Sequence, residues 1–223
     1  MHQSISRNIF IYLFIFLFLV TANNTKIFQN NILKITGFEI WGLNDFENKK
    51  LISDLEYLKN ENIFYLNKKK LYSKINSEKI VEKFTVFKKY PSKIIIEIEK
   101  TSFLAVTKKD NKNFYVGSNG SLIEIEEGIS DLPFIFGDVD IEEFLKFKKI
   151  IDKSKFNYNS IDKLYYFKSK RWDIKTKSGL IIKLPSKEVD YLLNILPKLS
   201  QSEEFKDINV IDLRQKNQII ING

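Results

Sequence analysis

Residues Lys93–Glu99 read K-I-I-I-E-I-E and carry the clearest structural signal in this 223-residue chain. Successive side chains of a β-strand point to opposite faces of a sheet. Ile94, Ile96 and Ile98 therefore share one wholly apolar face, while the opposite face carries two glutamates. This alternation predicts a strand that is buried on one side only.

The residues before this strand predict further elements in the order strand, helix, helix, strand. The expected elements are a strand over Ile32–Trp41, a helix over Asn48–Leu58, a helix from Asn67 to Ile75 and a strand over Ile80–Phe87. Both helical segments repeat apolar residues along one face of a 3.6-residue period. Gly37 lies inside the first strand pattern and suggests a bulge or a close backbone approach. Ile32–Glu99 is therefore expected to form a three-stranded sheet with two helices on one face.

From Phe103 onward, short apolar segments alternate with turn-forming residues, a texture typical of hairpins. Two longer segments, Ile141–Ile151 and Lys187–Leu199, have helical periodicity. The last expected strands are Asn209–Leu213 and Gln218–Ile221. The whole chain is thus α+β, and its second half is a mostly antiparallel β domain with one or two helices.

A turn at Lys177–Gly179 joins two strands whose apolar residues have even numbers. The residues concerned are Trp172, Ile174, Leu180, Ile182 and Leu184. If the turn preserves parity, an antiparallel hairpin places them all on one face. Trp172 is therefore expected in the core.

The N-terminal run Ile9–Val20 contains no charged residue and is the most apolar stretch of the chain. As a helix it is only about 18 Å long, against a hydrocarbon core of about 30 Å. Residues 21–22 lengthen the helix, and Arg7 can extend its side chain toward the lipid headgroups, so the difference between helix length and membrane thickness becomes smaller. We expect an uncleaved membrane anchor. The alternatives are a signal peptide cleaved after Val20-Thr21-Ala22 and, less compatible with an all-round apolar helix, a buried core helix.

The composition excludes several kinds of chemistry. The chain has no cysteine, and its one histidine, His2, precedes the apolar run. Disulfides, thiolate sites and histidine-based catalysis or metal binding are therefore excluded from the remainder. The net charge is +8, but the lysines are scattered and arginine is scarce, so nucleic-acid binding is not expected. No cofactor, metal or small-molecule substrate is expected.

Paired acidic residues do not form a catalytic set. Glu97 and Glu99 share a strand face, but nothing marks a cleft around them, so they are expected to be solvated. Asp212 and Arg214 are two residues apart on a strand and are expected to pair or to brace a turn. The alternative is that these two residues contact a partner.

Several short motifs, in their order and spacing, resemble the FtsQ/DivIB family of bacterial division proteins. The motifs are Asn62–Asn67, Lys88-Lys89-Tyr90-Pro91, Glu99, Gly120, Leu132-Pro133 with Gly137, Arg171-Trp172, and Asp212-Leu213-Arg214. The family has a short cytoplasmic tail, one membrane span, a POTRA domain (β-α-α-β-β) and a β-rich domain in the periplasm. The resemblance implies a tail over residues 1–8, a transmembrane signal anchor over 9–22, a tether over 23–31, a POTRA domain over 32–102 and a β domain over 103–223.

The resemblance also implies a function. By this resemblance, the chain is expected to be a non-enzymatic scaffold that links early and late division proteins. It is expected in the inner membrane, concentrated at the septum. Its small single-span partners, FtsB-like and FtsL-like proteins, dock through the C-terminal strand.

Two candidate binding sites follow from this resemblance and from the residues themselves. Because the chain stops at Gly223, soon after the last expected strand, that strand is expected at a sheet edge, open to strand addition. The expected contact residues there are Gln218, Ile219, Ile220, Ile221 and Asn222. The second site, for recruitment to the division site, is Lys88, Lys89, Tyr90 and Pro91.

Two other functions remain open at this point. POTRA domains also act as accessories of protein transport and outer-membrane assembly, usually before a β-barrel, for which the hairpins here are too few and too short. An exported hydrolase using Ser/Lys or carboxylate chemistry is disfavoured by the missing His and Cys.

Overall fold

A computed structural model of the chain describes residues 7–22, 33–125, 131–199, 208–216 and 218–222. The expected tether and residues 1–6 of the expected tail lie outside these described residues. The globular part divides after Lys100 into two compact units, each of which is described by itself.

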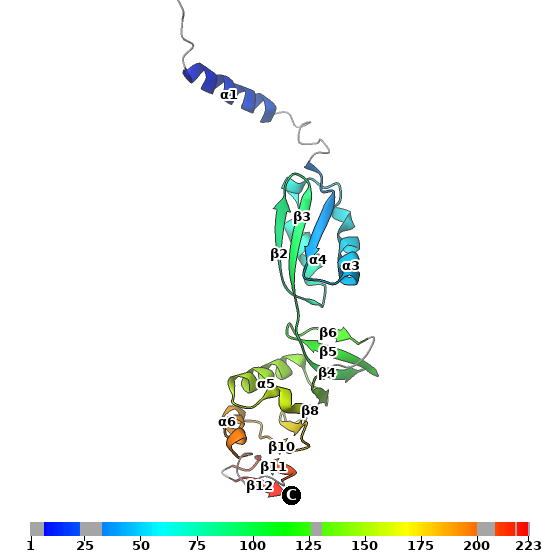
Figure 1. Ribbon diagram of the computed structural model, residues 1–223, viewed down its shortest axis with the longest axis vertical. Coiled ribbons are helices and arrows are strands. Elements are labelled where there is room, and N and C mark those ends of the chain that lie inside the picture. Colours follow the sequence, from blue (N-terminus) through cyan, green and yellow to red (C-terminus); the bar gives the residue numbers. More distant parts are fainter. Residues whose placement is uncertain (1–6, 23–32, 126–130, 200–207, 217, 223) are drawn as a thin grey trace, which may run out of the picture. The chain divides into compact units, whose positions relative to one another are not determined.

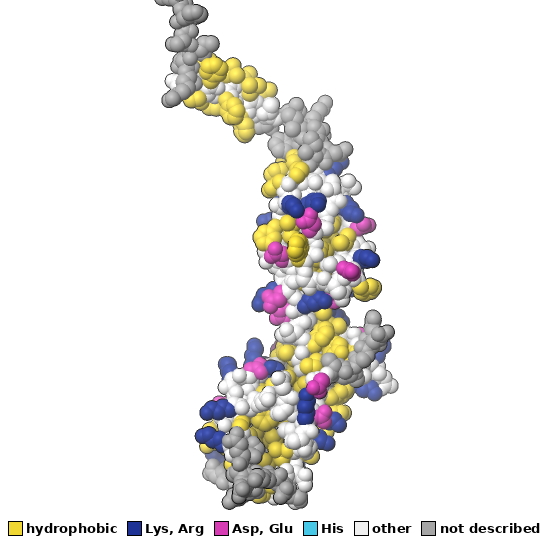
Figure 2. Space-filling model, in the orientation of Figure 1, with side chains coloured by type: hydrophobic (Ala, Val, Ile, Leu, Met, Phe, Trp, Pro, Cys, Tyr) yellow, Lys and Arg dark blue, Asp and Glu magenta, His cyan; other side chains and the backbone are white. Residues whose placement is uncertain are grey.

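The N-terminal apolar run forms helix α1, Arg7–Ala22, whose described side chains are all exposed (Figures 1 and 2). The helix has 16 residues. Within the described part of the chain, no helix combines the length and the apolarity needed to cross a membrane.

The first globular unit is a three-stranded sheet with helices on one face (Figure 1). Its elements are β1 (Gly37–Trp41), α3 (Asp45–Leu55), α4 (Lys68–Asn76), β2 (Val81–Lys89) and β3 (Lys93–Lys100), with short 3₁₀ turns at Glu56–Leu58 and Ile63–Tyr65. The sheet order is β1-β3-β2, with β1 parallel and β2 antiparallel to the central strand β3. The expected order of elements is confirmed.

The alternation in β3 accounts for this arrangement. Ile94 and Ile96 are fully buried and Ile98 nearly so, while Glu97 and Glu99 are exposed. The buried isoleucines belong to one apolar core with residues of both helices, among them Leu51 of α3 and Leu71 of α4. One side of a single strand thus organises the whole unit.

Two boundary predictions in this unit are wrong. The helix expected from Asn48 begins at Asp45, because Asn44 and Glu47 form a reciprocal capping box. The strand expected from Ile32 begins only at Gly37. Gly37 pairs in regular register with Lys93, and a Cβ atom there would meet nothing within 4 Å, so the expected bulge or close approach is absent.

In its described residues, the second unit contains nine strands and two helices. The strands are β4 (Phe103–Lys109), β5 (Lys112–Gly117), β6 (Leu122–Glu124), β7 (Phe134–Phe136), β8 (Ile161–Tyr166), β9 (Trp172–Thr176), β10 (Ile181–Lys183), β11 (Val210–Asp212) and β12 (Ile220–Asn222). They form one sheet in the order β12-β11-β10-β9-β8-β7-β4-β5-β6. Helix α5 spans Ile141–Lys153, α6 spans Val189–Leu199, and a 3₁₀ turn covers Tyr158–Ser160.

Three of the eight strand pairs in this sheet are parallel, which the hairpin pattern does not predict. Parallel neighbours need a crossover connection, usually a helix. Helix α5 connects β7 to β8, and α6 connects β10 to β11. The expected mostly antiparallel sheet is therefore correct, but two βαβ units are built into it.

Both helices contribute to one core with the sheet. Phe147 of α5 stacks on Trp172 with ring centroids 4.7 Å apart, and Leu193 of α6 is fully buried. Trp172, Ile174, Ile182 and Leu184 all lie in this core, and Leu180 packs against it. The shared face predicted for this hairpin is confirmed.

Aromatic side chains gather on the strands β4, β5, β7 and β8. The stacked or tilted ring pairs are Phe103–Tyr115, Phe134–Phe136 and Phe136–Tyr165, with centroid separations of 4.4, 4.6 and 5.2 Å. Val106 lies opposite both Tyr115 and Phe134 in register and is fully buried outside the main core. Figure 2 shows hydrophobic side chains over this part of the sheet.

Candidate functional site

The C-terminal strand β12 is the outermost strand of the nine-stranded sheet. It pairs antiparallel with β11, so that Val210, Ile211 and Asp212 lie opposite Asn222, Ile221 and Ile220. The expected strand Gln218–Ile221 is thus displaced towards the C-terminus and spans Ile220–Asn222. The described residues of this segment are exposed, and Ile220 is 50% exposed.

The hydrogen bonds between β11 and β10 show which backbone N–H and C=O groups of β11 point to each neighbouring strand. The N–H of Ile181 donates to the carbonyl of Asn209 at 2.9 Å, and the N–H of Leu213 donates to the carbonyl of Lys183 at 2.9 Å. Along a strand, alternate residues direct their backbone groups to the same neighbour. The backbone groups of Ile211 and Leu213 therefore face β10, whereas those of Val210 and Asp212 face β12.

In β12, the pairing with β11 determines which backbone groups point away from the sheet. Ile220 and Asn222 lie opposite residues 212 and 210, so their groups point to β11. The carbonyl of Asn222 accordingly accepts a hydrogen bond, at 3.0 Å, from the N–H of Asn209, which precedes β11 and whose own carbonyl faces β10. The N–H and C=O of Ile221 point outward, and no described strand pairs with them.

The register also determines on which face of the sheet each side chain of β12 lies, which the sequence alone does not decide. Ile221 lies opposite Ile211, which is buried in the core between the sheet and α6, so the two side chains share the helix-covered face. Ile220 lies opposite Asp212 on the other face. A strand laid beside β12 thus meets an isoleucine on each face.

A row of charged residues leads across the sheet to Ile220. Asp173, Lys183 and Asp212 lie opposite one another on β9, β10 and β11. Burial raises the pKa of Asp173, which is 6% exposed, and the nearby Arg171 guanidinium, 3.6 Å away, opposes this shift. The charged groups of this row are therefore partly shielded from water.

The Asp212–Arg214 pair braces the turn that follows β11. The Nε of Arg214 donates to both carboxylate oxygens, at 2.8 and 3.0 Å, and the Arg214 N–H donates to Oδ1 at 3.0 Å. These bonds, chiefly the guanidinium ones, hold the pKa of Asp212 below its usual range. The expected pairing is confirmed, and it fixes the start of the connection to β12.

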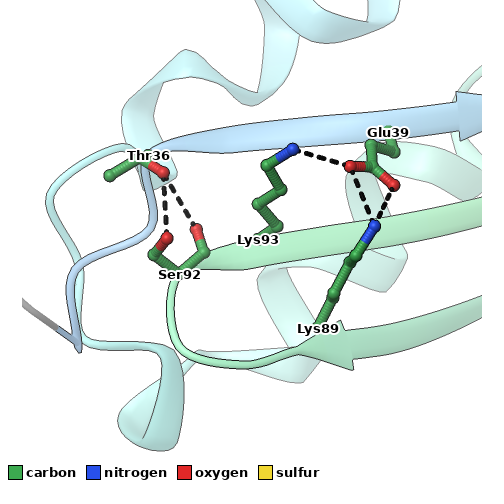
Figure 3. Close-up of polar contacts among 5 residues, drawn as sticks. All are labelled: Thr36, Glu39, Lys89, Ser92 and Lys93. Atoms are coloured by element: carbon green, nitrogen blue, oxygen red, sulfur yellow. Dashed lines mark hydrogen bonds and ion pairs between the residues drawn. The ribbon is translucent and has the colours of Figure 1, made fainter.

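The second candidate surface is the turn Lys88–Pro91 between β2 and β3. Figure 3 shows that Lys89, at the end of β2, and Lys93, at the start of β3, converge on Glu39 of β1. Their ammonium groups lie 3.0 and 2.8 Å from its carboxylate. The hydrogen bonds from Lys93 and then from Lys89 lower the pKa of Glu39. This cluster ties the base of the turn to all three strands.

The four turn residues predicted as a site have different environments. Lys89 is engaged with Glu39, whereas Lys88 reaches only the Phe64 carbonyl, at 3.4 Å. Tyr90 is joined to Pro91 by a cis peptide bond, and its side chain is 55% exposed. The ring of Tyr90 packs against that of Phe64, with the two ring centroids 5.1 Å apart. The surface offered to a partner is therefore mainly Lys88 and Tyr90.

Two neighbouring aromatic residues were missed as site residues. Phe64 and Tyr65, in the 3₁₀ turn after Asn62, are 51% and 77% exposed. Because Phe64 contacts Tyr90, it extends the exposed aromatic surface of the turn. The available signal was a pair of adjacent aromatic residues in a short apolar run, Ile63–Leu66, flanked by polar residues. The described residues contain no group of three or more His, Cys, Asp or Glu side chains able to hold a metal ion.

Comparisons with known proteins match both units. Residues 33–100 match the model of a POTRA domain of FtsQ type, and residues 105–214 match the model of the C-terminal part of the cell division protein FtsQ/DivIB. The chain is 25% identical over 212 residues to the cell division protein FtsQ of Rickettsia bellii, covering 88% of this chain and 76% of that protein. It is 28% identical over 156 residues to DivIB of Bacillus subtilis, covering 69% and 59% of the two chains.

Among solved structures, one similar chain is the major extracytoplasmic domain of DivIB from Geobacillus stearothermophilus. It is 13% identical, covers 48% of this chain and 96% of its own, and has a TM-score of 0.36.

The Glu39 cluster predicts a specific dependence of stability on pH. A carboxyl with a lowered pKa in the folded state stabilises the fold above its unfolded-state pKa, here about 4.5, and loses this contribution as the pH falls through the folded-state value. We expect Glu39→Gln to lower the urea midpoint of the first unit at neutral pH. The difference from the parent chain should shrink between about pH 5 and pH 3.

Glu99→Gln is the matched control, because the Glu99 carboxylate lies 3.6 Å from a single ammonium group, that of Lys83. About 1 M salt should reduce the Glu39 effect, since the cluster is solvent-exposed. An E39Q difference that stayed constant across this pH range would contradict the electrostatic role of the cluster.

Proposed function

Because this chain belongs to the FtsQ/DivIB family of cell division proteins, we propose that it is a non-enzymatic scaffold of the division machinery. It links early and late division proteins at the septum by binding them through its two globular units. The observation that carries this proposal is the edge strand β12, with outward backbone groups at Ile221 and exposed side chains on both faces.

The C-terminal edge binds its partner by strand addition. An unpaired strand edge presents a row of donors and acceptors to any extended segment, and main-chain hydrogen bonds then supply affinity. The partner is a small single-span division protein of the FtsB or FtsL kind. It extends the sheet beyond β12 and makes the strand an inner one.

Side chains on the two faces of β12 give this edge its selectivity. Ile220 continues the charged row that ends at Asp212, so a partner strand meets an apolar side chain beside ionic groups on that face. Ile221 lies on the helix-covered face and is 46% exposed. A partner with apolar residues at alternate positions fits both isoleucines.

The first unit recruits the protein to the division site through the Lys88–Pro91 turn and the adjoining aromatic residues Phe64 and Tyr65. Exposed aromatic side chains beside a cation are enriched in protein interfaces. Here the Glu39 cluster holds the backbone of the turn while Tyr90 remains exposed. The surface is thus pre-organised for a protein partner.

Residues 9–22 anchor the chain in the inner membrane, with both globular units in the periplasm. Helix α1 is about 24 Å long at about 1.5 Å per residue, shorter than a hydrocarbon core of about 30 Å. Local thinning of the bilayer and snorkelling by flanking residues compensate for a mismatch of this size.

Proline at position 221 tests the strand-addition proposal. Ile221→Pro removes an outward N–H, and its ring obstructs an added strand, while the backbone groups that bind β11 remain. We expect the amount of partner recovered from solubilised membranes to fall by about tenfold or more, with the urea midpoint of the second unit nearly unchanged.

Two variants serve as controls for this experiment. Ile221→Ala keeps the backbone N–H and shortens the side chain. It therefore distinguishes the contribution of the side chain to binding from that of the backbone. Ile220→Pro removes an N–H that faces β11 and is expected to lower stability as well. Undiminished partner recovery with I221P would refute strand addition at this edge.

Changes in the turn test recruitment without disturbing the Glu39 cluster. We expect a Lys88→Glu/Tyr90→Ser double variant to disperse a fluorescent fusion away from the septum, because both exposed contacts are lost while Lys89 keeps its ion pair. Phe46→Ser, at a residue 78% exposed on α3, is the matched control. Normal septal placement of the double variant would rule this surface out.

Charged residues in α1 test the anchor. Each lysine near the centre of a spanning helix costs about 2.5–3.5 kcal/mol of insertion free energy. The parent chain should stay with membranes after an alkaline wash, whereas Leu13→Lys/Phe16→Lys should be released. Phe46→Lys controls for the added charge. Release of the parent chain itself would argue against anchoring.

A further inference from the structure

A groove of about 530 Å³ lies between the first turns of α6 and the connection from β11 to β12. Its apolar lining comes from both elements: Tyr191, Leu192, Ile195, Leu213 and Ile219. Tyr191 is 66% exposed and Ile219 is 41% exposed. A concave apolar surface with exposed large side chains on both walls is typical of a binding site.

The charged residues of this groove are mainly basic. Lys187, Arg214 and Lys216 contribute positive charge, and Glu188 contributes the one negative charge of the lining. Arg214 is engaged by Asp212. Lys187 and Lys216 form no ion pair with any residue that the structure describes. The groove is therefore complementary to an apolar segment that carries carboxylates.

The groove is continuous with the edge strand. Ile219, which lines it, immediately precedes β12, and Gln218 lines it as well. A strand added antiparallel to β12 ends beside the first residue of β12. Antiparallel pairing is slightly more stable per residue than parallel pairing. The chain that leaves such a strand enters the groove directly.

We propose that this groove binds the polypeptide segment that directly follows the captured strand in the same partner protein. The segment inserts apolar side chains between Tyr191 and Ile219 and places carboxylates beside Lys187 and Lys216. This inference rests on the proposed capture of a partner strand by β12. It adds a second contact that anchors one end of that strand and sets its direction.

Site-specific photocrosslinking in the full chain, in dividing cells, tests the inference. The crosslinking amino acid p-benzoylphenylalanine replaces Tyr191 in one variant and Ile220 in the other. We expect both positions to give an adduct with the same partner. Mass spectrometry should place the peptide crosslinked from position 191 immediately C-terminal to the one crosslinked from position 220.

The outcomes separate this inference from the proposed function. An adduct at position 220 with none at position 191 overturns the groove and leaves strand capture standing. A different protein at position 191, or a peptide N-terminal to the captured strand, also overturns it. No adduct at either position overturns strand capture and the groove together.

Charge reversal gives a second, independent measurement. We expect Lys187→Glu/Lys216→Glu to weaken binding of the partner identified at position 220 by about fivefold, and to reduce the salt dependence of that binding. Lys108→Glu/Lys168→Glu, at two exposed lysines outside the groove, is the matched control. Equal effects of the two double variants would overturn the electrostatic match.

Discussion

Backbone hydrogen bonding at the outer edge of the larger sheet is the constraint on which the candidate function depends. Every inner strand has a neighbour on each side, whereas β12 has one, β11. Unpaired backbone groups at a sheet edge seek a partner, and water or another strand can supply it. Among the described strands, the outward groups of Ile221 are therefore left open to the strand addition that we propose.

The position of this edge follows from the connection made by α6. A helix between β10 and β11 brings β11 back parallel to β10, and a short connection then lays β12 antiparallel outside it. The helix that covers the core thus also places β11 and β12 at the end of the sheet, and it forms one wall of the groove beside β12.

Ionic clusters support both candidate surfaces without occupying them. Arg214 binds Asp212 at the start of the β11–β12 connection, and Lys89 and Lys93 bind Glu39 at the base of the turn between β2 and β3. Such partly exposed pairs add little free energy of folding. They restrict the conformations of the β11–β12 connection and of the turn between β2 and β3 instead. Tyr90 and Ile220 remain exposed on this restrained backbone.

Local sequence patterns determined the element types, the capped start of α4 at Asn67, and the buried face of β3, because period-two alternation and capping act over a few residues. The last strand pattern, Gln218–Ile221, and the motif Lys88–Pro91 likewise pointed to the two candidate surfaces. Only the tertiary structure decided the parallel pairs, the face of Ile221 and its outward backbone. Consecutive isoleucines, as at 219–221, do not show which face is buried, and no local pattern shows which neighbour is bonded; both depend on register between residues far apart in the chain. The exposure of Phe64 beside Tyr90 is decided in the same way, by packing across the unit rather than by neighbours in sequence.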